Sequence, residues 1–126
     1  MKDTVHTDAA PAAVGAYSQA TTDGSLVFTA GQIPLTPEGE LLADADVATQ
    51  TAQTLDNLLA VLAAEGADAD DVLKVTVFLA DIDDFEEMNE TYADYFETEP
   101  PARSAVEAGA LPKGVAVEIE AVASVE

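Results

Sequence analysis

The sequence contains no cysteine. This absence excludes disulfide bonds, thiolate nucleophiles, iron–sulfur clusters and cysteine-ligated zinc sites. Histidine occurs once, as His6 near the start of the chain, so a histidine-ligated metal site or a Ser-His-Asp triad could form only around this residue. We expect His6 to face solvent, and we predict no metal site.

Phosphate-binding loops and membrane-spanning runs are missing as well. Neither G-x-G-x-x-G nor a Gly-Lys-Ser/Thr triplet occurs, so nucleotide cofactors have no recognisable binding loop. No apolar run approaches the roughly 18–20 residues that a membrane span needs. The first residues also lack the basic and apolar regions of a signal peptide. We therefore predict a cytoplasmic protein with no cofactor and no membrane partner.

Basic residues are scarce: the 126 residues include 25 Asp and Glu but only 4 Lys and Arg, a formal net charge of −21. The cations Lys2, Lys74, Arg103 and Lys113 are scattered, whereas nucleic-acid binding needs clustered Lys and Arg to displace phosphate counterions. Direct DNA or RNA binding is therefore not expected. Because the Debye length falls to about 3 Å at about 1 M salt, this composition indicates halophilic adaptation, with the interspersed acids on solvated surfaces.

The residues that are present follow the pattern of one α+β domain spanning residues 1–126. Hydrophobic residues make up 48% of the chain, as in globular proteins, and no internal repeat or linker interrupts it. The hydrophobic pattern predicts a strand at 25–29, a helix at 46–65 and a strand at 72–80. A second helix begins at Asp84 with a capping box completed by Glu87. Closing strands are predicted at 102–108 and 115–125.

Two helices can cover only one face of such a sheet. Residues 72–80 are continuously apolar apart from Lys74 and Thr76, which is typical of a central strand that is buried on both faces. The second face of the sheet therefore needs another cover. We infer that partner subunits supply it and that the protein is an oligomer.

Arg103 is a candidate functional residue because a strand-borne guanidinium needs a partner in a chain with so few basic residues. It follows Pro100, Pro101 and Ala102 directly. The spacing allows a structural ion pair with Glu107 or another carboxylate. It equally allows a substrate carboxylate to bind through the two parallel N–H donors of the guanidinium.

Glu118 and Glu120 alternate with Val117 and Ile119 in the last predicted strand, so both glutamates point away from the helix-covered core, roughly 7 Å apart. They could simply face solvent. If partner subunits cover that face, burial and like charge would raise a carboxylate's pKa towards a value that suits a general base. Asn89, at the edge of the second helix's apolar stripe, could hydrogen-bond backbone at the sheet edge.

Several longer stretches of the sequence match a known family. They are residues 10–20 (APAAVGAYSQA), 30–35 (AGQIPL), 74–79 (KVTVFL) and 101–104 (PARS), followed by Leu111-Pro112 and 117–120 (VEIE). Through these stretches nearly the whole chain resembles the Rid family of reactive-intermediate deaminases (RidA, also called YjgF-type). The resemblance implies a chorismate-mutase-like α+β subunit, assembled as a homotrimer with helices outside and clefts between subunits.

The resemblance also implies an activity: hydrolysis of 2-imino or enamine acids, such as 2-iminopropanoate and 2-iminobutanoate, to 2-oxo acids and ammonia without a metal or cofactor. On this basis Arg103 binds the substrate carboxylate and Glu118 activates the attacking water. The expected substrate-binding residues are Tyr17, Gly31 (through its backbone), Asn89, Ala105 and Glu120.

Two positions depart from the family pattern. Ala30 stands where a serine is common, and Ala105 stands where a cysteine is common. Neither position supplies the carboxylate contact or the base, so we expect activity to survive with a possible change in substrate preference. The alternative hypothesis is a non-catalytic small-molecule-binding or regulatory trimer that uses the same cleft.

Overall fold

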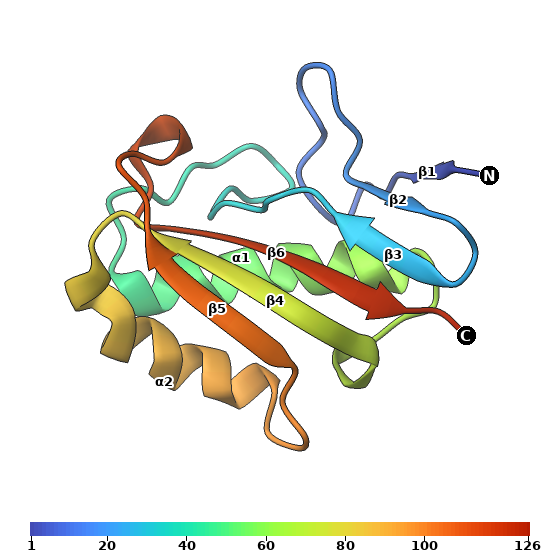
Figure 1. The fold of residues 1–126 in the computed structure, drawn as a ribbon. Helices are drawn as coiled ribbons and strands as arrows, with labels where there is room; N and C mark the ends of the chain where they lie inside the picture. Colours follow the sequence, from blue (N-terminus) through green and yellow to red (C-terminus); the bar gives the residue numbers. More distant parts are fainter.

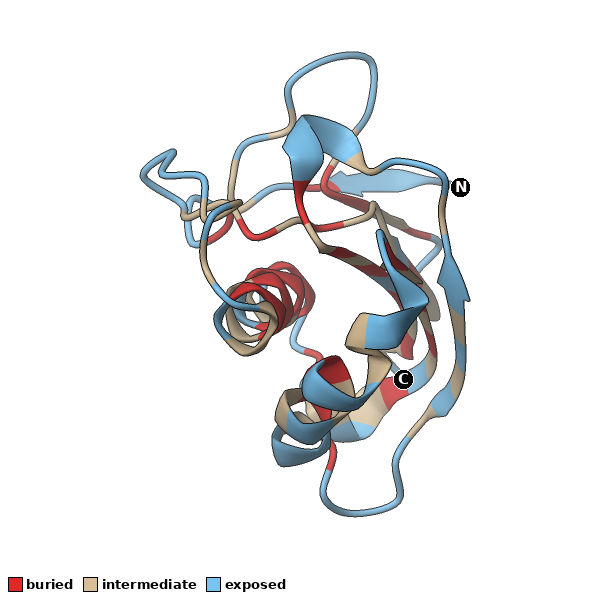
Figure 2. Ribbon diagram, turned by 90° about the vertical axis from the view of Figure 1, so that its left-hand side faces the viewer, coloured by how far each residue is buried: buried red, intermediate tan, exposed pale blue.

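The computed structural model describes residues 1–126 as one mixed sheet with two helices on one of its faces (Figures 1 and 2). The strands are β1 (Asp3–Val5), β2 (Ala20–Thr22), β3 (Leu26–Thr29), β4 (Val72–Leu79), β5 (Ala102–Glu107) and β6 (Val117–Ser124). The helices are α1 (Val47–Ala63) and α2 (Phe85–Tyr95), with short 3-10 helices η1 (Ala69–Asp71), η2 (Ile82–Asp84) and η3 (Pro112–Gly114). The strand order is β1-β2-β3-β6-β4-β5, and only β4 and β5 pair in parallel.

The predicted α+β architecture, a mixed sheet with two helices on one face, is confirmed. Each predicted helix and strand is present, with ends that differ by up to two residues. Strands β1 and β2 are additional. The sequence pattern does not reveal them because each has only three residues, too few to show alternation.

The capping box predicted from Asp84 and Glu87 is absent. Because η2 runs directly into α2, the backbone at Asp84 is near-helical (φ −81°, ψ 2°) and not extended. An N-cap side chain reaches the first turn from an extended backbone, and the Asp84 side chain makes no such bond. Glu87 instead accepts a hydrogen bond of 3.1 Å from the Ala48 N–H, which links the starts of the two helices.

Side-chain alternation divides the sheet into a covered face and an open face. The covered face contributes Val75 and Val77 from β4 and Ile119 from β6, all fully buried against the helices. On the open face, Phe78 of β4 pairs with Glu118 of β6. Within one chain β4 is therefore buried on one face only, and the inference that partner subunits cover the other face stays a prediction.

The open face carries large apolar side chains that one chain leaves in solvent. Phe28 is 49% exposed and Val106 is 45% exposed, and Leu73 at the irregular start of β4 is 52% exposed. The helices, by contrast, bury their apolar stripes almost completely, including Leu58 of α1 and Met88 of α2. No helix combines the length and apolarity that crossing a membrane requires.

The two helix starts predict opposite effects of the same substitution. The Asp46 carboxylate caps α1 by accepting from the Thr49 N–H at 2.8 Å, and these bonds to Thr49 lower its pKa. Burial and the charges of Asp81, Glu87 and Asp83 raise the pKa of Asp84, which caps nothing. We expect Asp46→Ala to lower the Tm at pH 7 and Asp84→Ala to leave it unchanged or raise it.

Calorimetry as a function of pH measures both effects. Since the folded-state pKa of Asp46 is depressed, its stabilising contribution is present above the unfolded-state pKa and is lost as the pH falls through the folded-state value. The raised pKa of Asp84 means that its ionised form opposes folding above that pKa, an effect that acid removes. A lower Tm for Asp84→Ala than for Asp46→Ala at pH 7 would contradict this account.

Candidate active site

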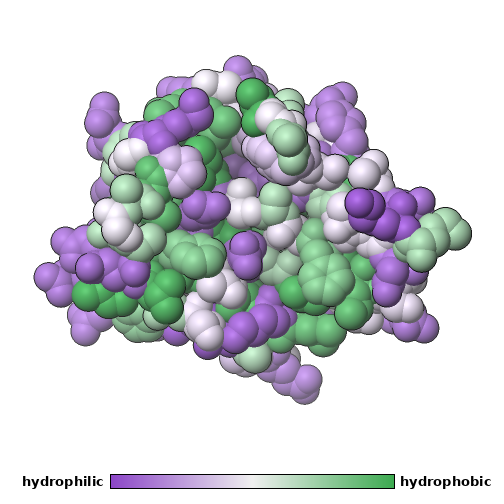
Figure 3. Space-filling view, turned by 45° about the horizontal axis from the view of Figure 1, so that its top comes forward, coloured by the Kyte–Doolittle hydropathy of each residue, from purple (hydrophilic) through white to green (hydrophobic).

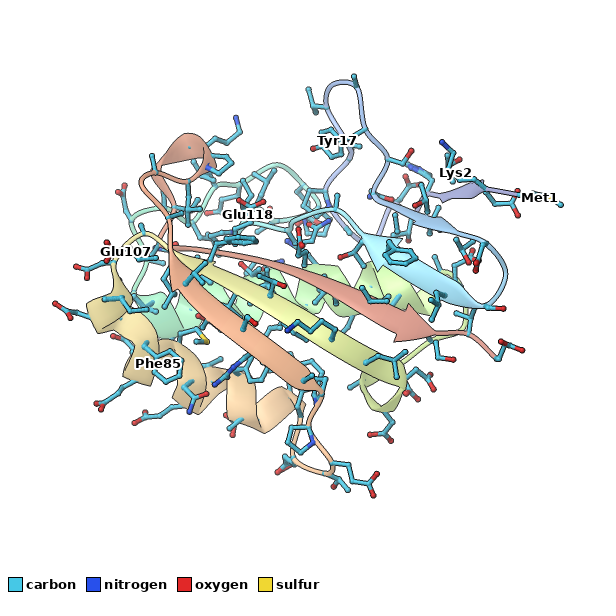
Figure 4. All side chains as sticks on the ribbon, in the orientation of Figure 1. Met1, Lys2, Tyr17, Phe85, Glu107 and Glu118 are labelled. Atoms are coloured by element: carbon cyan, nitrogen blue, oxygen red, sulfur yellow. The ribbon has the colours of Figure 1, made fainter.

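A cleft of about 810 Å³ opens beside Glu118, which we call the Glu118 cleft. Its walls come from three connecting segments: the loop that carries Tyr17, the segment that follows β3, and η3. Figure 4 shows Tyr17 and Glu118 on the same side of the molecule, and Figure 3 shows apolar and polar side chains interspersed there. Half of the 16 lining residues are hydrophobic, so the cleft suits a small ligand with a few polar contacts.

Glu118 approaches the cleft directly over Gly31. A Cβ atom at position 31 would lie 2.9 Å from Cδ and 3.1 Å from Cγ of Glu118, so the glutamate occupies the space that any other residue would need. A bulge creates this approach: Phe28 pairs with Val122, but pairing resumes at Gln32 with Ile119, one residue out of register. Neither the N–H nor the C=O of Gly31 hydrogen-bonds within the chain.

The Glu118 carboxylate is half-buried and has no hydrogen-bond partner in the chain. Burial raises the pKa of Glu118, and the like charge of Glu120 raises it further. Glu120 itself is exposed and lines a separate shallow depression with Lys74 and Thr76. The two glutamates therefore share the open face, as predicted, but only Glu118 lines the large cleft.

A buried amide that the sequence reasoning missed shapes the loop carrying Tyr17. Gln19 is only 2% exposed. Its Nε2 donates to the carbonyl oxygens of Thr7 (3.0 Å) and Pro11 (2.8 Å), and its Oε1 accepts from the Thr7 N–H at 2.7 Å. One side chain thus satisfies several backbone groups of the loop and determines its course past the cleft.

Asn57 has the same role for the segment that follows β3. This buried residue of α1 donates from Nδ2 to the carbonyl oxygens of Ile33 (3.1 Å) and Leu35 (2.7 Å), both of which line the cleft. The available sequence signal was a carboxamide on the apolar side of a helix, next to Leu58. Buried polar groups need hydrogen-bond partners, so such a position predicts a bond to nearby backbone.

Arg103 lies in a second group of residues, the Arg103 cluster, which comprises Arg103, Phe85, Asn89 and Tyr92. The Nη1 of Arg103 donates to Asn89 Oδ1 at 2.6 Å. The guanidinium carbon lies 5.2 Å from the ring centre of Phe85 and 4.7 Å from that of Tyr92. Figure 4 shows Phe85 on α2, beyond the β5 edge of the sheet and away from Glu118.

Two alternatives that the sequence allowed for these residues are wrong. Arg103 forms no ion pair with Glu107, because the Glu107 carboxylate accepts from the Ile82 N–H at 2.9 Å instead. Asn89 does not bond backbone at the sheet edge; its side-chain oxygen is the acceptor for Arg103. The guanidinium therefore has neutral neighbours in a chain that carries 25 acidic residues.

A single chain does not bring the predicted site together. In β5, Arg103 pairs with Val75 and Ala105 pairs with Val77, so both lie on the covered face beside α2. Glu118 lies on the open face. The predicted residues thus form two groups on opposite faces: Tyr17, Gly31 and Glu118 around the cleft, with Glu120 nearby, and Asn89, Arg103 and Ala105 beside α2.

The single histidine lies away from both groups. His6 faces solvent, as predicted, with Nε2 3.0 Å from an oxygen of Asp8. No group of three or more His, Asp or Glu side chains is arranged to hold a metal ion.

Comparison with known proteins identifies the family. A family model described as endoribonuclease L-PSP matches residues 7–125. The chain belongs to this family. A RutC family protein of Pyrococcus horikoshii is 49% identical over 98% of both chains, and the 2-iminobutanoate/2-iminopropanoate deaminase of Escherichia coli is 46% identical over 98% of both chains. The structure of Escherichia coli TdcF with bound serine has a TM-score of 0.92 and 42% identity, and the match covers 97% of this chain and 98% of that one.

This family is the YjgF/RidA family, so the resemblance inferred from the sequence is confirmed. The match runs through both groups of site residues, because it spans almost the whole chain. The solved family structures share the mixed sheet with two helices.

Substituting Gly31 tests how closely Glu118 depends on the space above that glycine. Gly31→Ala would push the carboxylate out of its half-buried position, so the pKa of Glu118 should fall towards the ordinary value for glutamate. Carboxyl carbon NMR titration measures this pKa. Gly24→Ala is the control, since nothing lies within 4 Å of Gly24 and only its backbone is strained. An unchanged Glu118 pKa in Gly31→Ala would contradict the close approach.

Proposed function

We propose that this protein hydrolyses reactive 2-imino and enamine acids, such as 2-iminopropanoate and 2-iminobutanoate, to 2-oxo acids and ammonia. The observation that carries the proposal is a guanidinium without a carboxylate partner in a chain of net charge −21. Such a group is available to an incoming carboxylate. Relatives named 2-iminobutanoate/2-iminopropanoate deaminase, and a family structure with bound serine, support substrates of the amino-acid type.

We infer that each site forms between two subunits of a homotrimer. β5 is an edge strand, so Arg103 lies at the margin of its subunit, while Glu118 lies on the open face. A head-to-tail ring can place the β5 edge of one subunit against the open face of the next. Arg103 and Asn89 of one subunit would then meet Glu118, Gly31 and Tyr17 of its neighbour.

In this arrangement Arg103 binds the substrate carboxylate and thereby positions the imine carbon. A water molecule adds to that carbon while the Glu118 carboxylate accepts its proton. Glu118 then gives this proton to the nitrogen, which forms a carbinolamine. Glu118 next takes the proton of the new hydroxyl and passes it to the amino nitrogen, so that the C=O bond forms as the C–N bond breaks and ammonia leaves a 2-oxo acid. The imine carbon is already electrophilic, so positioning and one base suffice, and the raised pKa of Glu118 suits these proton transfers.

The alternative is a binding or regulatory trimer that uses the same cleft without catalysis. It needs the carboxylate contact of Arg103 but no base, so it predicts no role for the half-buried Glu118. RNA cleavage is not proposed: Lys113 is the one basic residue that lines the Glu118 cleft, and a chain of net charge −21 repels phosphates.

Two substitutions separate catalysis from binding. Glu118→Gln keeps the shape of the side chain but removes the base, so ammonia release from freshly generated 2-iminobutanoate should fall about 10²- to 10⁴-fold while 2-oxobutanoate still binds. Arg103→Lys keeps the charge but loses the paired N–H donors, so kcat/KM should fall roughly 30- to 1000-fold and 2-oxobutanoate binding should weaken. Glu120→Gln, outside the cleft, is the matched control.

The pH profile of the wild type gives an independent readout of the base. Because the ionised Glu118 carboxylate accepts the proton, the rate should decrease as the pH falls through the raised pKa of that residue. Normal hydrolysis by Glu118→Gln, together with retained 2-oxobutanoate binding, would contradict the catalytic role and favour the binding trimer.

Assembly should depend on salt. We expect a particle of about three times the 13.0 kDa subunit mass in molar salt, because contact between subunits buries the exposed apolar side chains of the open face. In low salt the repulsion between subunits of net charge −21 is unscreened, so dissociation or loss of structure should follow. Light scattering across a salt series measures both. A monomer in molar salt would contradict the trimer, and salt-independent behaviour would contradict halophilic adaptation.

A further inference from the structure

Arg103 is the only arginine in the sequence, and three residues that contact its guanidinium form one stripe of α2. Phe85, Asn89 and Tyr92 are separated by four and three positions, the spacing that places side chains on one face of a helix. Asn89 accepts a hydrogen bond from Nη1, while the two rings lie 5.2 and 4.7 Å from the guanidinium carbon. The guanidinium is thus held by one amide and two aromatic faces.

None of the acidic residues of α2 lies on this stripe. The helix carries four acids, and none lies within ion-pair distance of the guanidinium. They are Glu86, Glu87, Glu90 and Asp94. A carboxylate in place of Asn89 or Tyr92 would form an internal ion pair and compete with any external carboxylate. The neutral stripe therefore keeps the guanidinium free of the protein's own acids.

Tyr92 contacts Arg103 through its ring, although it also carries a buried hydroxyl. The residue is 4% exposed, and its hydroxyl is buried with no hydrogen-bond partner. Such a hydroxyl contributes nothing to stability and costs its desolvation. The ring, however, lies closest to the guanidinium and also packs 4.8 Å from the ring of Phe96. The contact with Arg103 is therefore made by the aromatic face and not by the hydroxyl.

We propose that Tyr92 is a positioning residue, whose buried ring, with Phe85, orients Arg103 for an incoming carboxylate while keeping it away from the protein's own acids. The role of the carboxylate ligand rests on the proposed function. The orientation of the guanidinium does not, because it is a property of the free protein.

NMR tests the orientation without any ligand. Since the chain has one arginine, its side-chain Nε–H signal needs no assignment. Protons above an aromatic face are shifted upfield, and an ordered side chain has a high heteronuclear NOE. We expect both features in the wild type and in Tyr92→Phe, which keeps the ring. Tyr92→Leu should lose both features. Phe85→Leu, at a half-buried position, should weaken them, and this variant provides the test if Tyr92→Leu does not fold.

Calorimetric binding of 2-oxobutanoate and ammonia release test the consequence. Tyr92→Leu should raise the Kd and the KM about 5- to 30-fold, with kcat within about twofold of the wild type; Tyr92→Phe should restore wild-type values. Tyr95→Leu is the matched control, because it removes an aromatic side chain from the same end of α2, and that side chain bonds Asp56 of α1 and does not lie over Arg103.

The outcomes separate the two proposals. Wild-type NMR features together with an unchanged Kd in both Tyr92→Leu and Phe85→Leu would overturn the positioning role. A Tyr92→Phe variant as impaired as Tyr92→Leu would also overturn it, and so would the absence of 2-oxobutanoate binding by the wild type. If the wild type binds 2-oxobutanoate in a Tyr92-dependent way but releases no ammonia, the positioning role stands and the deaminase function fails.

Discussion

The alternation of side chains across the sheet is the constraint on which the rest of this structure depends. It places Arg103 on the covered face beside α2 and Glu118 on the open face, with β4 between their strands. No rotamer change can bring a side chain through a sheet. A site that uses both residues must therefore be shared between subunits, and the same contact would bury the apolar side chains that one chain leaves exposed.

Charge is the second constraint. In a chain with 25 acidic residues, an arginine remains free only if its surroundings exclude carboxylates. The Arg103 cluster does this with an amide and two rings, and Glu107 is engaged by the Ile82 N–H instead. On the other face, burial of Glu118 over Gly31 produces a carboxylate with a raised pKa. Each of the two groups of residues thus has a local electrostatic environment that differs from the acidic surface.

Much of the fold could be predicted from the sequence because α1 and β6 follow clear periods of 3.6 and 2, and β4 is a nearly continuous apolar run. Strands β1 and β2 were too short for that signal. The period in β6 also predicted that Glu118 faces away from the helices. The environment of Arg103 could not be predicted, because it depends on how α2 packs against β5. Likewise, Gln19 and Asn57 act on backbone groups distant in sequence, and only the tertiary structure shows which carbonyls they meet.

The central claim is that Arg103 and Glu118 act from different subunits, and subunit mixing tests it most directly. Arg103→Lys and Glu118→Gln are each expected to be nearly inactive alone. When the two are co-expressed in equal amounts and assemble at random in a head-to-tail ring, about one quarter of the sites receive both native residues. The account therefore predicts ammonia release at about a quarter of the wild-type rate. A mixture no more active than its separate components would contradict a shared site.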